Sequence, residues 1–347
     1  PMIHYASEAR GYGPMLFFAF LSVWLMQRHL ERPDGAGAAA IAMALVFGLL
    51  SHLTFAIAIA GLAAWALWAR YLECRSIQRT FQMLAPPFLP AALYLILYGI
   101  VAAKAFVIRG NIFEPATMAV AKFAGNALGL DPAGPSSIGL LCIYVAATVT
   151  GVIWLFRLNT PGLPLYAVVV VLCPLSAIVV ETKPYLLARY FLITLPFAML
   201  LALDVGRELT KRSGLMGRAV LAAALAFFFA SNLDATARFL GPKRGDYGRA
   251  VAAIAADSSA PVSVTGSPDF SVGTLIRYHA KRLGLENQVA FAERPAPAAR
   301  WHIWRVTPGA SPPARLQVDG AGFDLDRRYT HWGLSGDTWA LYRRQPE

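Results

Sequence analysis

Near the start of the chain, the residues whose side chains could take part in binding or catalysis lie in "SEARGYGP", residues 7 to 14. Glu8 and Tyr12 are four positions apart and share a face if this segment is helical, whereas Arg10 points elsewhere. A carboxylate here could orient a metal ion or an attacking hydroxyl, and a guanidinium grips phosphate through paired hydrogen bonds. The plainer interpretation is an anchor at the membrane interface, where tyrosine is common.

A second group of ionisable residues stands between two apolar runs at 179 to 204. Ionisable groups at membrane depth are costly and usually face a partner or a water-filled cavity, so Lys183 and Arg189 suit an anionic lipid phosphate. The alternative is that these long side chains reach the interface and that Glu181 pairs with Lys183. A lone histidine such as His52, in the turn "SHLT", is more often a hydrogen-bonding group than a ligand.

The composition indicates the class of protein that holds these groups. The chain has 347 residues, of which 57% are hydrophobic and 15% charged, whereas a typical globular protein is about 25% charged. The apolar residues gather in runs close to the roughly 20 residues that cross a bilayer. The sequence therefore predicts a mainly α, polytopic membrane helical bundle. We expect about eight spans, at 13 to 27, 36 to 50, 54 to 69, 84 to 106, 136 to 156, 164 to 181, 187 to 205 and 217 to 232.

The arginines and lysines predict the orientation of this bundle, because cytoplasmic loops hold an excess of them. With residues 1 to 12 outside, the inside loops hold more of these cations than the outside loops that precede residue 233. Eight spans then return the C-terminus to the outside. The net charge of +11 would suggest nucleic acid in a soluble protein, but these loops explain much of it, and no nucleic-acid partner is expected.

The composition changes at about residue 233, where the last apolar run ends. "DYGRAVAAIAAD" (246 to 257) and "FSVGTLIRYHAKRLG" (270 to 284) predict helices, and Gly284 is a plausible end of the second. "APVSVTG", "RWHIWRV" and "TWALYRR" are typical of strands. We therefore predict a transmembrane domain at 1–232 and a small extracytoplasmic α/β domain at 233–347.

One more outer segment, 107 to 135, contains "ATMAVAKFAGNALGL", which has an apolar face at helical spacing. This pattern fits a helix that lies in the membrane interface, and it fits equally a helix that packs on the spans.

Motifs of soluble nucleotide or hydrolytic chemistry are absent from the sequence, among them the P-loop, His-Glu-x-x-His and Gly-x-Ser-x-Gly. The three cysteines all precede residue 233, so the C-terminal domain has no disulfide framework.

The order of four short motifs resembles a known superfamily. "SEARGYGPMLFFAFLS", "SHLTF", "KPYLLARYFLITLPFAMLLAL" and "GDYGRAVAAIA" resemble, in that order, the C-terminal two-thirds of a glycosyltransferase-C superfamily protein. The chain is similar to the bacterial dolichyl-phosphate-mannose and aminoarabinose-transferase-like membrane enzymes. The first three motifs match that group's Glu-Ala-Arg-x-Tyr pattern, its Thr/Ser-His-x-x-Phe/Tyr turn and its Arg-Tyr-x-x-x-x-x-Pro entry to a late span.

The resemblance implies a glycosyltransferase of the cell envelope, placed in a bacterial inner membrane with its C-terminal domain outside. Such an enzyme transfers a sugar, with inversion, from a polyprenyl-phosphate donor to a lipid, glycan or protein acceptor. The family's leading acidic residue, generally taken as the catalytic base, is expected upstream of Pro1.

The resemblance also implies roles for individual residues. Glu8 is the expected secondary acid, which assists catalysis through a divalent metal ion or through hydrogen bonds. The residues expected to bind the donor phosphate are Arg189, Lys183 and Arg10. The residues expected to shape the site around them are Tyr12, His52 and Tyr190.

Two other classes of function are open to the sequence. A polytopic transporter or flippase of a lipid-linked glycan predicts inverted repeats and charges near the bilayer midplane, whereas the charges in this chain cluster at one surface. A non-catalytic membrane assembly subunit predicts an exported domain that binds a partner. Alanine in place of Glu8 or Arg189 should abolish transfer by an enzyme and leave the partner binding of such a subunit intact.

Overall fold

The structure is a computed structural model, and it describes residues 11–105, 115–128, 130, 137–180, 188–240, 246–258, 260–296, 298–306, 311–330 and 338–345. The chain forms two compact units. The helical unit comprises Pro1–Val107 and Phe113–Asn232, and the sheet unit comprises Ile108–Ile112 and Leu233–Glu347. The predicted residues Glu8, Arg10 and Lys183 lie outside the described residues.

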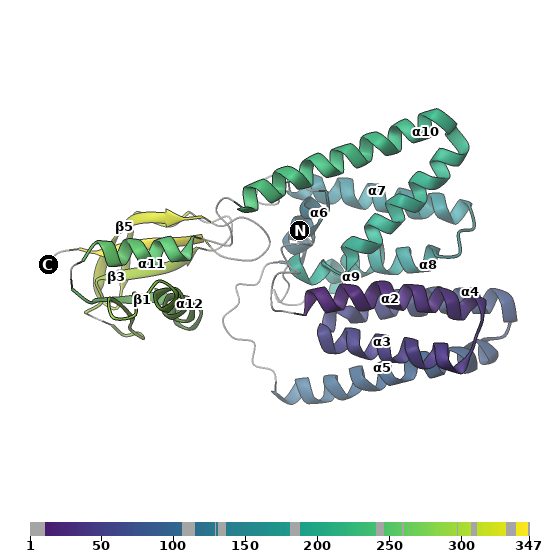
Figure 1. The fold of residues 1–347 in the computed structure, drawn as a ribbon, viewed down its shortest axis with the longest axis horizontal. Helices are drawn as coiled ribbons and strands as arrows, with labels where there is room; N and C mark the ends of the chain where they lie inside the picture. Colours follow the sequence, from purple (N-terminus) through teal and green to yellow (C-terminus); the bar gives the residue numbers. More distant parts are fainter. Residues whose placement is uncertain are drawn as a thin grey trace. The chain divides into compact units, whose positions relative to one another are not determined.

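Helices make up nearly all of the described part of the helical unit (Figure 1). The longer helices are α2 (Tyr12–Glu31), α3 (Gly35–Ser51), α4 (Ala56–Cys74), α5 (Ile77–Ala105), α6 (Ala116–Ala127), α7 (Ser137–Arg157), α9 (Cys173–Val180) and α10 (Thr194–Leu240). The shorter ones are η1 (Leu53–Phe55), α8 (Leu163–Tyr166), the π-helix η2 (Ala167–Leu172) and η3 (Ala188–Phe191). Non-helical dihedrals at Gly214, φ 54° and ψ −120°, fold α10 into two arms.

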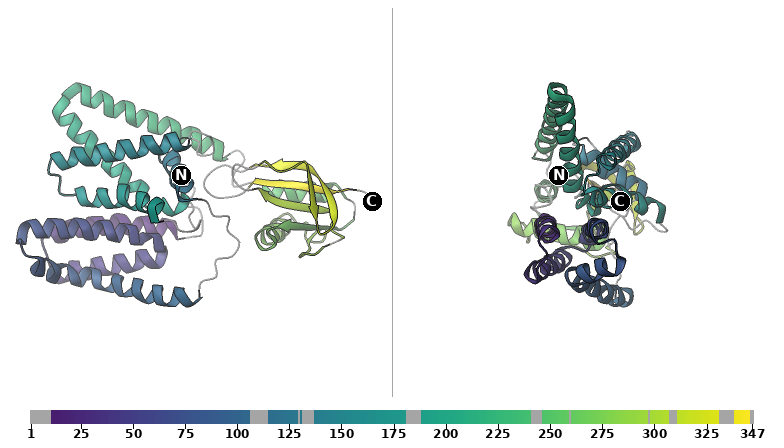
Figure 2. Two further views of the ribbon diagram at one scale, coloured as in Figure 1. Left: turned by 180° about the vertical axis from the view of Figure 1, so that it is seen from behind. Right: turned by 90° about the vertical axis from the view of Figure 1, so that its right-hand side faces the viewer.

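Successive long helices of this unit run in opposite directions, which places distant segments at the same end. The start of α2, the end of α3, α6 and the end of α9 lie together in Figure 1 and again in the left view of Figure 2. We call this end of the helical unit the α6 end. It brings together the segments that contain Tyr12, His52 and Arg189.

The helices support a membrane location. Among the described helices, four are long and apolar enough to cross a bilayer, and Gly35–Ser51 and Leu163–Val179 are apolar but shorter. Much of their apolar surface is exposed in the chain alone, for example on Leu97, Ile143 and Phe229. Large exposed apolar patches are rare on soluble monomers. The chain therefore has the properties of a membrane protein, although fewer helices qualify as spans than the eight predicted.

Close helix packing in this unit depends on small residues at two positions. A Cβ added at Gly48 of α3 would lie 2.4 Å from the ring of Phe55, and one at Gly61 of α4 would lie 2.3 Å from the side chain of Val169 in η2. Small residues let membrane helices approach closely, and packing then supplies much of their association energy. The contact at Gly61 thus links the helices α2–α5 with the helices α6–α9.

The helix that contains the third predicted span, at 54 to 69, extends beyond residue 69. α4 continues to Cys74, and Arg70 is buried within it at 3% exposure. Its guanidinium donates to the carbonyl oxygens of His29 and Leu30, each at 2.8 Å, and to Glu73 at 2.5 Å. The last carbonyls of a helix have no partner within that helix. Arg70 supplies two of them, at the end of α2, with a charged donor.

The segment predicted either as an interfacial helix or as scaffold forms α6 and packs on other helices. Ala119, Val120 and Phe123 of α6 are buried, and the ring of Phe123 lies 5.6 Å from that of Tyr144 in α7 and 5.9 Å from that of Phe191 in η3. This face of α6 therefore packs on the neighbouring helices, as the second of the two interpretations predicts.

The described part of the sheet unit forms a six-stranded mixed sheet in the order β2-β1-β3-β6-β5-β4. The strands are β1 (Val262–Ser267), β2 (Val289–Phe291), β3 (Trp301–Val306), β4 (Arg315–Val318), β5 (Ala321–Tyr329) and β6 (Thr338–Arg344). β1 pairs in parallel with β2 and β3, and the remaining pairs are antiparallel.

Two helices, α11 (Tyr247–Ala256) and α12 (Asp269–Arg282), cover one face of this sheet. The core between them and the sheet includes Val264, Trp301, Ile303, Trp339 and Leu341. A smaller core on the opposite face includes Val306, Val318, Phe323, Ala340 and Tyr342. Both predicted helices and the strands β1, β3 and β6 are confirmed, and α12 is followed by Gly284 with φ +68°. The strands β2, β4 and β5 were not predicted.

Candidate functional site

The structure brings two of the sequence-predicted residues into direct contact at the α6 end. The rings of Tyr12 and His52 stack with their centroids 4.5 Å apart and an angle of 27° between their planes. Tyr12 is the first residue of α2 and is 1% exposed, whereas His52 stands between α3 and η1 and is half-buried. The two motifs that contain them are therefore parts of one local structure.

Local hydrogen bonds hold His52 in this position. The backbone N–H of Thr54 donates to His52 Nδ1 at 3.3 Å, and Thr54 Oγ1 lies 2.8 Å from the same nitrogen. Thr54 Oγ1 also lies 3.4 Å from Met15 Sδ, which ties the turn to α2. These contacts hold the ring of His52 through Nδ1.

Gly11 allows the two motifs to meet. Its φ of +74° is in the left-handed region that favours glycine. A Cβ at this position would lie 2.0 Å from the carbonyl oxygen of Ser51. No side chain fits into that distance, so glycine permits the start of α2 to touch the end of α3.

Arg189 and Tyr190 belong to a separate cluster at the same end. Both lie half-buried in η3, which is anchored by Phe191 against Phe123. Among the described residues, no carboxylate lies within ion-pair distance of Arg189. The elements α6 and η3 carry Lys122 and Arg189 and no acidic residue.

The structure does not join the two clusters through a described contact. Tyr12 and His52 contact each other, whereas Arg189 and Tyr190 lie on the element that packs against α6. Both clusters lie at the α6 end of the helical unit. The assigned roles of these residues remain predictions.

The described residues do not form a metal site. Among them, no three histidine, cysteine, aspartate or glutamate side chains gather closely enough to hold a metal ion. The predicted metal ligand Glu8 lies outside the described residues. We therefore derive no chemical step through a metal.

A second group of buried polar side chains lies in the sheet unit. His302 is 0% exposed, Thr265 beside it on β1 is 1% exposed, and neither the two ring nitrogens nor the hydroxyl has a hydrogen-bond partner in the described part of the chain. Arg294 forms two hydrogen bonds with Asp319, at 2.8 and 3.1 Å, and donates to Ser267 at 3.2 Å.

These surroundings control the charge of His302. Burial and, to a smaller extent, the Arg294 cation lower its pKa to about 4, while Asp319 opposes them. Arg294 in turn holds the pKa of Asp319 below its usual range. Because His302 and Thr265 are enclosed, they offer no surface to a substrate, and we assign them to the structure of the sheet unit.

Several residues of the α6 end were not identified from the sequence. Gly11, Met15 and Thr54 build the contact between Tyr12 and His52, yet each has an ordinary residue type for its place. The only signal was local: a threonine two residues after a histidine can bond to it in a turn. The approach of Gly11 to Ser51 joins residues distant in the chain and has no sequence signature.

The chain has no significant match among models of protein families, among curated proteins or among solved structures. Function is therefore inferred from the residues and their geometry.

Proposed function

We propose that the protein is a membrane glycosyltransferase that takes a sugar from a polyprenyl-phosphate donor. The observation that carries this proposal is the meeting of Tyr12 with His52 at the end of the helical unit that also holds Arg189. A site of this kind, with cations at the end of apolar helices, matches a donor that has a long apolar tail and an anionic phosphate.

The proposed reaction is an inverting displacement at the anomeric carbon of the sugar. An acceptor hydroxyl attacks that carbon, the bond from carbon to the phosphate oxygen breaks, and the polyprenyl phosphate leaves with the electron pair. The hydroxyl proton passes to a base on the enzyme. Groups placed where negative charge develops contribute strongly to such reactions.

Each predicted residue has a role in this proposal. Arg189, assisted by Lys183 and Arg10, stabilises the charge on the leaving phosphate. Tyr12, His52 and Tyr190 shape the pocket, and Glu8 assists as the secondary acid. The proposal includes eight spans, an extracytoplasmic sheet unit and a bacterial inner membrane.

The test is transfer of radiolabelled sugar from polyprenyl-phosphate donors in membranes that contain the protein as its gene encodes it. Arg189→Ala should lower transfer by at least about a hundredfold, the scale seen when one stabilising donor is removed from an active site. The matched control is Arg157→Ala, which removes the same charge from the last turn of α7 at the opposite end of the unit. Equal activity of the two variants would exclude the proposed role of Arg189.

A further inference from the structure

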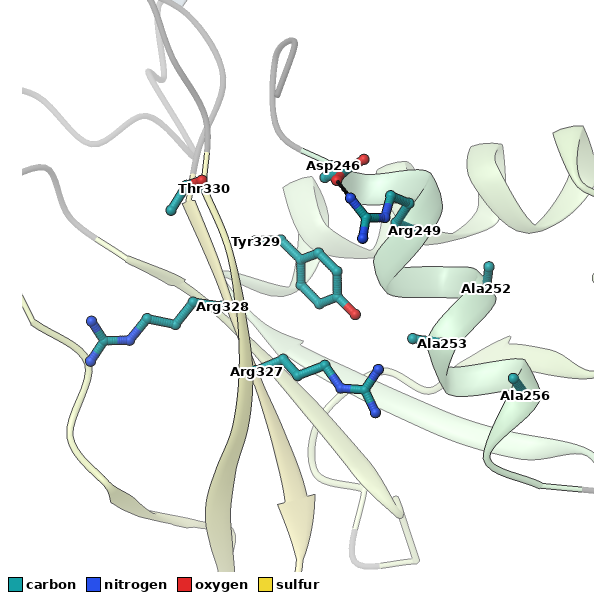
Figure 3. A pocket seen from close by; sticks show the side chains of 9 residues that line it. All are labelled: Asp246, Arg249, Ala252, Ala253, Ala256, Arg327, Arg328, Tyr329 and Thr330. Carbon is teal, nitrogen blue, oxygen red and sulfur yellow. Dashed lines mark hydrogen bonds and ion pairs between the residues drawn. The ribbon is translucent and has the colours of Figure 1, made fainter. Parts of the chain in front are cut away.

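A groove in the sheet unit lies between α11 and β5. Its volume is about 820 Å³, within the range of about 300 to 1,000 Å³ common for ligand pockets. It is lined by Asp246, Arg249, Ala252, Ala253, Ala256, Arg327, Arg328, Tyr329 and Thr330 (Figure 3). Arg249 and Arg327 direct their guanidinium groups toward the groove beside the one aspartate of its lining, and the three alanines leave its α11 wall without bulky side chains.

A β-bulge aims Arg327 into this groove. Along β5, Leu325 is opposite Tyr342 and Arg327 is opposite Leu341, so one extra residue separates the two pairs. Leu325 and Tyr342 belong to the core on the face away from the helices, whereas Leu341 belongs to the core beneath α11 and α12. Regular alternation would put Arg327 on the same face as Leu325. The bulge instead puts it on the face of α11.

The next residue, Arg328, points away from the groove. It is opposite Ala340, a residue of the core on the far face, and its guanidinium donates to the carbonyl oxygen of Pro312 at 3.4 Å. Figure 3 shows Arg327 extending toward α11 and Arg328 extending in the other direction. Bulges often re-aim side chains beside functional sites.

Arg249 approaches the groove from α11. Its guanidinium pairs with Asp246 at 2.9 Å, and Arg327 pairs with its neighbour Asp326 at 2.9 Å. The arginine side chains are 80% and 56% exposed. Exposed ion pairs contribute little to stability, so a stronger anion can replace either carboxylate as the partner of these guanidinium groups.

We propose that this groove binds a phosphate group through Arg249, Arg327 and the hydroxyl of Tyr329. Arginine matches phosphate because its planar donors bind two oxygens at once. The phosphate comes either from a lipid headgroup or from a soluble phosphate ester. The inference is independent of the glycosyltransferase proposal, because it uses only residues of the sheet unit.

The test measures hydrogen–deuterium exchange of the full chain in dodecyl maltoside micelles, which contain no phosphate. One series adds inorganic pyrophosphate, and a second adds phosphatidylglycerol to the micelles. We expect residues 247–256 and 321–329 to become protected in at least one series. Protection by pyrophosphate indicates a soluble ester, and protection by phosphatidylglycerol alone indicates a lipid headgroup.

Two variants make the result specific. Arg327→Ala should weaken the apparent affinity by about tenfold or more, the size expected when a hydrogen bond to a charged group is removed. Arg328→Ala removes the same charge from the adjacent position and should leave the affinity unchanged. The inference is overturned if the two variants bind alike, or if neither series protects α11 and β5 in the unmodified chain.

Discussion

Acidification should destabilise the sheet unit through His302. In the folded state burial lowers the pKa of this side chain to about 4, whereas an unfolded histidine has a pKa near 6.5. Between these values the unfolded chain binds a proton that the folded chain does not. Stability therefore falls as the pH drops below about 6.5, and the loss is complete near pH 4.

The size of this effect follows from the two pKa values. A fall from about 6.5 to about 4 corresponds to about 3 kcal/mol, a large share of the roughly 5 to 15 kcal/mol by which domains are stable. The charged groups that act on the ring are Arg294, which disfavours its protonation, and Asp319, which favours it. Its neighbours Thr265, Tyr342 and Phe323 are uncharged.

The assay is hydrogen–deuterium exchange of β3 and β6 in the full chain, corrected for the intrinsic pH dependence of exchange. Between pH 7.5 and 4.5 the opening free energy of the unmodified chain should fall by about 2 to 3 kcal/mol more than that of His302→Gln, which cannot take up the proton. Comparing the two losses removes the contribution of carboxylates that titrate in both proteins. Equal losses in both would refute the assignment of His302 as a buried neutral group.

Three further predictions concern a close backbone approach, a buried set of hydrogen bonds and a pair of ion pairs. Gly11→Ala should lower the apparent melting temperature by several degrees, because the new Cβ meets Ser51 and the backbone at this position is left-handed. Gly13→Ala is the control, and it should leave the melting temperature unchanged because the space around Gly13 is open. Arg70→Ala should cost about 3 kcal/mol by leaving carbonyls of α2 without a donor, which thermal unfolding in detergent will measure. Asp257→Ala removes the acceptor of two arginines and should increase exchange in α11 and β6, while unchanged exchange would contradict this role.

The sequence analysis identified the elements that have strong local patterns. The small apolar residues of α11 and the alternation of β3 and β6 are visible in single segments, and the structure confirms them. β5 was missed because its charged residues and its bulge break the alternation, and β2 was missed because it has three residues. The stretch between the last two predicted spans is helical up to Gly214, where one residue with positive φ makes the turn.

The site was predicted only as far as topology allows. Counting the predicted spans puts Tyr12, His52 and Arg189 at outer ends of their spans, and the elements beside them, α2, η1 and η3, lie at the α6 end. The stacking of Tyr12 on His52 depends on the approach of Gly11 to the end of α3, a contact between residues distant in the chain. Single-sequence patterns report local periodicity and not such contacts.

In the proposed function, the α6 end binds a lipid-linked phosphate. The most direct measurement is photo-crosslinking of the membrane-embedded protein with a polyprenyl phosphate that carries a photoreactive group near the phosphate, followed by mass spectrometry of the labelled peptides. We expect labels at residues 11–15, 51–55 and 188–193, with much less labelling in Arg189→Ala and unchanged labelling in Arg157→Ala. Labels at 29–35 and 157–163, at the opposite end of the helices, would contradict it.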